Sequence, residues 1–125
     1  MTAPVVGALL LAPAGCATAD RSGPAAIHHV VLIKLKDPSD ARELISDTRA
    51  RLSKIREVKE LRAGTPIEAR RAAADSDFSV ELSMWFDSDD AYRRYLENPA
   101  HTALVAAWRE RIADMRVIDV QESKP

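Results

Sequence analysis

The stretch YLENPAH, residues 95–101, places a tyrosine and a histidine on either side of a helix restart. Asn98 is a good N-cap, because its side-chain oxygen accepts hydrogen bonds from free backbone N–H groups. Pro99 suits the first helical position, where its missing N–H would have no partner. His101 falls on the first turn of the new helix, where the positive local potential favours the neutral imidazole. The stretch therefore predicts two consecutive helices and a histidine that can act as a base near neutral pH.

Outward from this restart, hydrophobic periodicity predicts the other helices and strands. Residues 78–86 alternate with the period of two that is typical of a strand. Residues 27–36 are apolar in the middle on both faces, which predicts a strand covered on both sides. The full predicted order is a strand at 27–36, a helix at 39–55, a weaker strand at 58–67, a strand at 78–86, a helix ending at 96, a helix at 98–113 and a strand at 115–121.

This order predicts the ferredoxin-like α+β fold, a four-stranded antiparallel sheet with helices on one face. The opposite face is too apolar to remain in water, and a second copy packed around a two-fold axis would cover it. We therefore expect a homodimer. Glu81 should lie on this face and pair with Arg116, and His28 should be exposed or lie at the dimer edge. The apolar residues of this face are Val30, Leu32, Trp85, Ile118 and Val120.

The composition limits the classes of function. With 18 basic and 19 acidic residues, the net charge is −1, which argues against a nucleic-acid-binding protein. The four glycines form no phosphate-binding loop. The three histidines have no acidic companions at ligand spacing, and the single cysteine, Cys16, excludes an intrachain disulfide or a cysteine-based metal site. We therefore expect no metal and no other cofactor.

The first residues differ from the rest of the chain. Residues 1–15 carry no charge, and Val5–Ala12 form an apolar run that is too short to span a bilayer but fits a signal-peptide core. Ala14-Gly15-Cys16 resembles the end of a bacterial lipobox, where a peptidase cleaves before a cysteine that becomes lipidated. Pro13 departs from that pattern, and no basic residue precedes the apolar run.

We therefore expect residues 1–26 to be a lipoprotein-type signal peptide and tether, residues 27–121 one domain, and residues 122–125 a tail. The expected location is the bacterial cell envelope, with Cys16 lipidated and with this lipid anchor as the attachment to a membrane. The alternative is a cytoplasmic protein whose first residues are a disordered or non-native extension.

Three motifs together resemble a known family. They are HHVVLIK at 28–34, FSVELSMWF followed by Asp-Ser at 78–88, and Tyr-x-x-x-Pro-x-His at 95–101. In their order and spacing they resemble the stress-responsive dimeric α/β-barrel (A/B barrel) domain family, over residues 27–121. The resemblance implies a homodimer in which two ferredoxin-like sheets close into an α/β barrel.

The resemblance also implies candidate site residues. A few members, such as the plant olivetolic acid cyclase, act on small aromatic or polyketide-derived molecules without a cofactor. By resemblance, His101 would be the general base, Tyr95 its hydrogen-bonding partner, and His29 the first-strand histidine of the site. Two positions depart from the cyclase, since Val80 stands where it carries a further histidine and Asn98 replaces a common histidine.

The pattern along the first strand partly agrees with this site. His29 shares the strand face that the helices cover, so its tip and those of Tyr95 and His101 could meet in an apolar cavity. The alternative is that these residues have structural roles. Tyr95 would then only fill the core with its ring, and His101 would form a hydrogen bond within the start of its helix. His29 would be a core histidine that forms a hydrogen bond with Tyr95.

Two functions follow from these alternatives. One is a dimer, tethered to the cell envelope, that acts structurally or binds a small apolar or aromatic molecule. The other is a cofactor-independent, cyclase- or isomerase-like enzyme for a small carbonyl or aromatic substrate.

Overall fold

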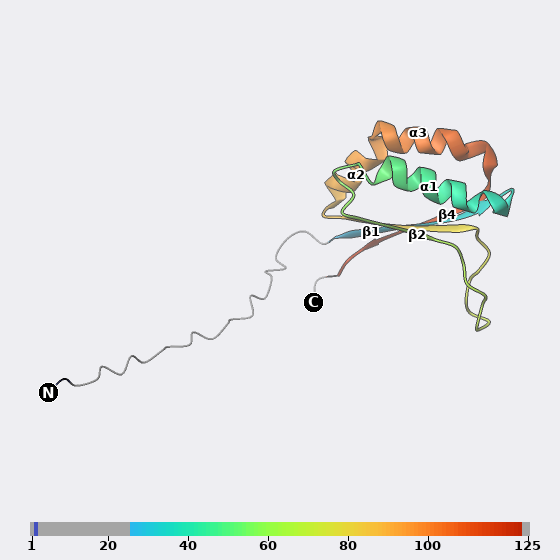
Figure 1. Ribbon diagram of the computed structural model, residues 1–125, viewed down its shortest axis with the longest axis horizontal. Helices are drawn as coiled ribbons and strands as arrows, with labels where there is room; N and C mark the ends of the chain where they lie inside the picture. Colours follow the sequence, from blue (N-terminus) through green and yellow to red (C-terminus); the bar gives the residue numbers. More distant parts are fainter. Residues whose placement is uncertain (1, 3–25, 124–125) are drawn as a thin grey trace.

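Strand β1 (Ile27–Leu35) lies inside a four-stranded sheet and pairs on both sides. The computed structural model describes residue 2 and residues 26–123. Within them the strand order is β2-β3-β1-β4, and every neighbouring pair is antiparallel. The other strands are β2 (Glu60–Gly64), β3 (Val80–Phe86) and β4 (Ile112–Gln121). One face of the sheet is covered by α1 (Ala41–Leu52), α2 (Asp89–Glu97) and α3 (Pro99–Trp108), as Figure 1 shows. The predicted ferredoxin-like α+β fold is confirmed.

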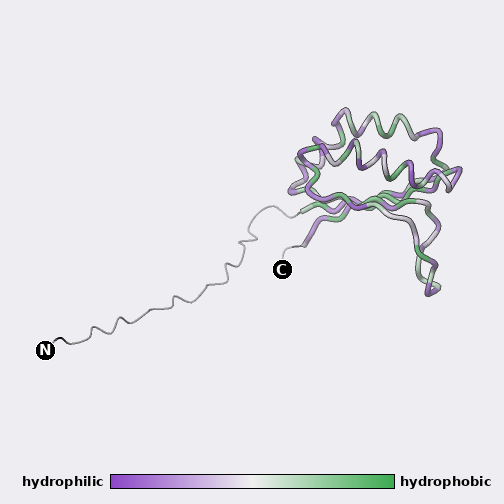
Figure 2. The backbone as a smooth tube through the Cα atoms, viewed as in Figure 1, coloured by the Kyte–Doolittle hydropathy of each residue, from purple (hydrophilic) through white to green (hydrophobic). Residues whose placement is uncertain are grey.

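Alternation along β1 separates a buried face from an open one. Every second residue from Ile27 to Leu35, His29 included, is buried beneath the helices. The residues between them, from His28 to Lys34, are half-buried or exposed. Successive side chains of a strand point to opposite faces, so the predicted cover is confirmed for the face of His29, whereas cover of the other face stays a prediction. Hydrophobic and hydrophilic residues also alternate along the helices, whose hydrophobic residues build the core with the strand (Figure 2).

The helix restart has the predicted geometry. Ser88 caps α2 by accepting a hydrogen bond from the backbone N–H of Ala91 at 3.1 Å. Asn98 caps α3 by accepting one from Ala100 at 2.9 Å, and Pro99 occupies the first helical position. The cap fixes where the second helix begins, so it also fixes the direction in which the first turn of α3 presents its side chains.

The predicted helix at 98–113 is too long, because β4 already begins at Ile112, one 3-10 turn after the end of α3. Arg111 in this turn donates to the Glu43 carboxylate of α1 at 2.8 Å. Its carbonyl accepts from the backbone N–H of Lys36 at 2.9 Å, which begins the ladder with β1. These contacts join distant segments and override the local helical pattern, so Ile112 packs against the core from a strand.

The connection between β2 and β3 projects from the sheet on the side away from the helices (Figure 1). Arg116 of β4 forms an ion pair with Asp75 in this connection. Ser83 donates a hydrogen bond to the Glu81 carboxylate two residues before it on β3. The predicted pairing of Glu81 with Arg116 is therefore wrong, because Arg116 forms its ion pair with Asp75 of the connection instead.

The open face of the sheet carries the predicted apolar residues beside charged ones such as Glu81 and Arg116. Ile118 and Val120 of β4 are about half exposed, beside half-buried residues of β1 and β3. His28 is half-buried rather than exposed, because its ring stacks on Trp85 with the ring centroids 4.1 Å apart. Apolar side chains left open to water are typical of an interface, and the homodimer stays our prediction for this face.

We expect Ile118→Glu to convert a dimer into a monomer. A carboxylate placed in an apolar interface loses its hydration without gaining a partner, which should weaken the dimer by about a hundredfold or more. Sedimentation velocity at micromolar concentration measures the effect. The matched control is Ala106→Glu, which adds the same charge at an exposed position of α3. A wild-type chain that sediments only as a monomer would contradict the prediction.

Candidate functional site

A cavity of about 400 Å³ lies between the helices and the sheet face that they cover. Its walls come from β1, β3, β4 and the three α-helices, and most of its lining is apolar. Two imidazoles and two phenols line it, those of His29, His101, Tyr92 and Tyr95. The apolar lining consists of Val31, Ile33, Leu44, Leu52, Leu82, Met84, Leu96, Leu104, Val105, Trp108, Ile112, Met115 and Val117.

These four side chains gather at one end of the cavity, and the charged side chain of Arg109 also lines it. His29 comes from β1, Tyr92 and Tyr95 lie one turn apart on α2, and His101 lies on the first turn of α3. The ring centroid of His29 is 5.1 Å from that of Tyr92 and 6.0 Å from that of Tyr95. The rings of Tyr95 and His101 are 4.5 Å apart. The helix restart therefore brings three elements of the fold to one small cluster of rings.

His29 is held by a carboxylate that the sequence analysis did not identify. Its Nδ1 lies 2.5 Å from Oδ1 of Asp119, the residue opposite it on β4. Tyr92 donates its hydroxyl to Oδ2 of Asp119 at 3.0 Å, and its oxygen lies 3.2 Å from Nδ1 of His29. Within residues 26–123, every side-chain hydrogen bond of His29 uses Nδ1. With Nδ1–H donated to the carboxylate, Nε2 carries the lone pair and can accept a proton.

His101 is held by the backbone. Its Nδ1 lies 3.1 Å from the carbonyl oxygen of Leu96, which fixes the ring at the junction of α2 and α3. Burial lowers the pKa of His101; the hydrogen bond to Leu96 opposes this shift, and the nearby His29 adds to it. The lowered pKa agrees with the predicted neutral imidazole. Its main cause is burial of the ring, whereas the sequence analysis assigned it to the end of the helix.

The two tyrosines keep their protons. Tyr95 is 1% exposed, and burial raises the pKa of its hydroxyl well above the ordinary value. Burial also raises the pKa of Tyr92, and its hydrogen bond to Asp119 adds to the shift. Both phenols therefore act as neutral hydrogen-bond donors near neutral pH.

The structure brings the three sequence-predicted residues together, since His29, Tyr95 and His101 line one cavity. Their catalytic roles stay predictions. His29 bonds Asp119 and Tyr92, so the expected core bond between His29 and Tyr95 is wrong. The sequence pattern could have identified the two missed residues, Tyr92 and Asp119. Tyr92 precedes Tyr95 by one helical turn, and the side chain of Asp119 points to the face opposite that of Ile118 and Val120.

The two departures from the cyclase pattern have different consequences. Val80 is fully buried in the core and does not line the cavity, so nothing at this position extends the polar cluster. Asn98 forms the cap of α3, a structural task that its side chain performs well. The polar end of the cavity therefore rests on residues from β1, β4 and the helix pair.

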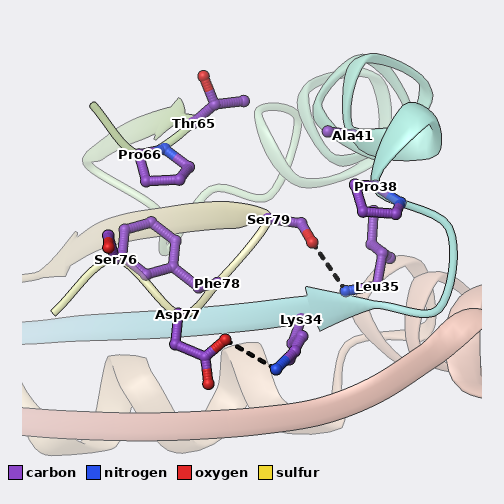
Figure 3. Close-up of a pocket in the computed structure, with 10 residues that line it drawn as sticks. All are labelled: Lys34, Leu35, Pro38, Ala41, Thr65, Pro66, Ser76, Asp77, Phe78 and Ser79. Atoms are coloured by element: carbon purple, nitrogen blue, oxygen red, sulfur yellow. Dashed lines mark hydrogen bonds and ion pairs between the residues drawn. The ribbon is translucent and has the colours of Figure 1, made fainter. Parts of the chain in front are cut away.

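A second hollow, of about 380 Å³, lies at the opposite end of β1 beside the β2–β3 connection (Figure 3). Its charged groups satisfy each other, since Nζ of Lys34 lies 2.7 Å from Oδ1 of Asp77. The backbone N–H of Leu35 donates to Oγ of Ser79 at 3.0 Å. These bonds fasten the connection to β1, so we assign this hollow a structural role.

Within residues 26–123, no group of three or more His, Cys, Asp or Glu side chains is placed to hold a metal ion. No helix of residues 26–123 has the length and apolar character needed to cross a membrane. Cys16, the predicted lipidation site, and the predicted leader lie outside the described residues.

Solved structures share this fold. A Dabb-family protein from Mesorhizobium loti is 27% identical, with a TM-score of 0.69, and the match covers 80% of this chain and 99% of that protein. A dimeric ferredoxin-like protein of unknown function from Thermobifida fusca is 23% identical, with a TM-score of 0.66 and coverages of 81% and 93%. A hydroxynitrile lyase from Passiflora edulis is 15% identical, with a TM-score of 0.70 and coverages of 82% and 97%. The last two similarities show the fold alone.

Sequence comparison identifies the family. An uncharacterized protein from Streptomyces coelicolor is 37% identical over 89 residues, which are 67% of this chain and 88% of that protein. The family model described as the stress responsive A/B barrel domain matches residues 27–122. This match spans nearly all of the described domain and agrees with the motifs on β1, β3 and the helix restart. The chain therefore belongs to the stress responsive A/B barrel domain family.

Proposed function

We propose that this chain is a homodimeric domain that binds a small, mainly apolar carbonyl compound and transfers a proton on it without a cofactor. The proposal is carried by the pairing of His29 with Asp119, 2.5 Å apart, at the end of a cavity of about 400 Å³. An apolar cavity with a few convergent polar groups is the common form of a small-molecule site. The hydroxynitrile lyase from Passiflora edulis is an enzyme on this fold, which supports a catalytic use of the fold here.

His29 is the base that the geometry favours. When Nε2 takes a proton from the carbon next to a carbonyl, the ring becomes an imidazolium, and the carboxylate of Asp119 stabilises that charge. The buried phenol of Tyr95 is suited to donate a hydrogen bond to the enolate oxygen that forms. The sequence-based assignment places the base at His101 with Tyr95 as its partner, and His101 has no carboxylate contact in the described chain.

The homodimer is part of the proposal. The apolar open face supports it, and the similar protein from Thermobifida fusca is described as dimeric. The cavity and the open face lie on opposite sides of the sheet, so closing a barrel between two sheets would leave the cavity of each protomer in place.

Proton exchange tests the base directly, without knowledge of the natural substrate. In D₂O, we expect the wild-type protein to accelerate exchange of the protons next to the carbonyl of 2-octanone, followed by NMR. His29→Gln should slow the protein-catalysed exchange by about a hundredfold or more, since a positioned base contributes about 10²–10⁴-fold. Asp119→Asn should slow it less, because the imidazole remains.

The matched control for exchange is Arg42→Gln, a surface change on α1 away from the cavity, which should leave the rate unchanged. Loss of exchange in His101→Gln with a normal rate in His29→Gln would return the base to His101. A wild-type rate equal to that of buffer would refute proton transfer.

The lowered pKa of His101 predicts that acid weakens the fold. In the unfolded chain His101 binds a proton near its ordinary pKa of 6.5, whereas the folded chain binds it only at lower pH. Between these two pKa values the unfolded state holds more protons, so the free energy of unfolding falls as the pH falls below 6.5. His101→Gln should weaken this dependence, as measured by urea unfolding across that window. An NMR titration that gives His101 a pKa at or above 6.5 would contradict the prediction.

We also propose that the domain is exported and tethered to the cell envelope through Cys16. The apolar run Val5–Ala12 followed by Ala14-Gly15-Cys16 supports this proposal. In a bacterial host, the wild-type chain should partition with membranes and Cys16→Ser should not, because the Cys16 sulfur would carry the lipid. Equal partitioning of the two chains would refute lipidation.

A further inference from the structure

The cavity has an open mouth of apolar side chains. Its inner walls are nearly inaccessible to water, as at Leu52 and Met84, which are each 1% exposed. Other lining residues are 39% to 51% exposed, and they come from the end of α2, from α3 and from the edge strand β4. These are Leu96, Val105, Met115 and Val117. The exposed side chains place the mouth between α3 and β4.

One charged residue stands at this mouth. Arg109 follows α3 directly, is exposed and lines the cavity. Its neighbour Arg111 is neutralised by ion pairs with Asp40 and Glu43. Among the ion pairs formed within residues 26–123, none involves Arg109. A guanidinium with free donors beside an apolar cavity is suited to bind a carboxylate on two parallel hydrogen bonds.

Arg109 and the ring cluster lie at opposite ends of the cavity. His101 and Arg109 are at the two ends of α3, and a helical rise of 1.5 Å per residue separates them by about 12 Å. The strands show the same separation. Asp119 of β4 lies opposite His29 at the ring end, and Met115 lies opposite Ile33 nearer to Arg109. The wall between the two ends is apolar. The cavity is therefore an elongated apolar space with a polar group at each end.

The charges decide which end would take an anion. At the ring end, the carboxylate of Asp119 already occupies Nδ1 of His29, and a second carboxylate there would be repelled. At the mouth, the cavity lining offers Arg109 and no acidic side chain. A structural alternative for Arg109 is the stabilisation of the negative end of the α3 dipole.

We propose that Arg109 selects ligands with a carboxylate, which pairs with the guanidinium while the apolar body of the ligand extends toward His29. This proposal rests on the proposed function, since it names the class of compound that the same cavity accepts. That class is an elongated, mainly apolar carboxylic acid with its carbonyl or other reactive group at the far end. Arg109 is a specificity-determining residue in this arrangement, and the proton transfer belongs to the ring cluster.

Two probes of equal chain length test the proposal. Isothermal titration calorimetry of the full chain with octanoate and with 1-octanol should show a preference for octanoate of about tenfold, because a charge-assisted pair is added. Arg109→Gln should remove this preference by weakening octanoate alone, while 1-octanol binds as before. Arg42→Gln, which removes the same charge from α1, should keep the preference.

The other outcomes of the titrations would each overturn a stated part of the proposal. Equal affinities of the wild-type protein for the two probes, or an unchanged preference in Arg109→Gln, would overturn the role of Arg109 and leave it as a helix-end charge. Loss of the preference in Arg42→Gln would assign it to net charge and overturn the proposal as well. Binding of neither probe would refute the ligand-binding cavity itself, and with it both proposals. Thermal unfolding of each variant checks that the fold is intact.

Discussion

The structure depends on the antiparallel register between β1 and β4. This register sets Asp119 opposite His29 and Ile118 opposite Val30. Because side chains alternate along a strand, a slip of one residue would move the carboxylate to the open face and an apolar side chain into the cavity. One pairing thus determines both the polar end of the cavity and the apolar face that predicts a partner.

In the ring cluster, a buried histidine is paired with a partly exposed carboxylate. His29 is 5% exposed, and an imidazolium at such a position requires a counter-charge. Asp119 provides one from the edge of the sheet, where its side chain keeps contact with water, and the Tyr92 hydroxyl bonds its second oxygen. The carboxylate is therefore less costly to maintain than a fully buried one. The buried His29 can have a charged partner because the carboxylate of Asp119 lies at the edge of the sheet, in contact with water.

The sequence predicted the order of elements because each depends on local signals. The alternation on β1 and β3 and the cap at Asn98 act within a few residues, and both appear in the structure. The end of α3 depends on the contact of Arg111 with Glu43, 68 residues away in the chain. The pairing of His29 with Asp119 joins residues 90 positions apart. Periodicity gives the facing of Asp119 but not the register, and the site depends on the register.

Two adjacent histidines show how neighbouring residues of β1 serve opposite faces of the sheet. His28 stacks on Trp85 at the open face, and His29 reaches the cavity on the other side of the same strand. A substitution at one position acts mainly on its own face, because neighbouring side chains of a strand point to opposite sides of the sheet. The lining of the cavity can therefore vary while the open face is kept. The solved structures that share this fold include an enzyme and a protein of unknown function, so the fold alone does not determine the activity.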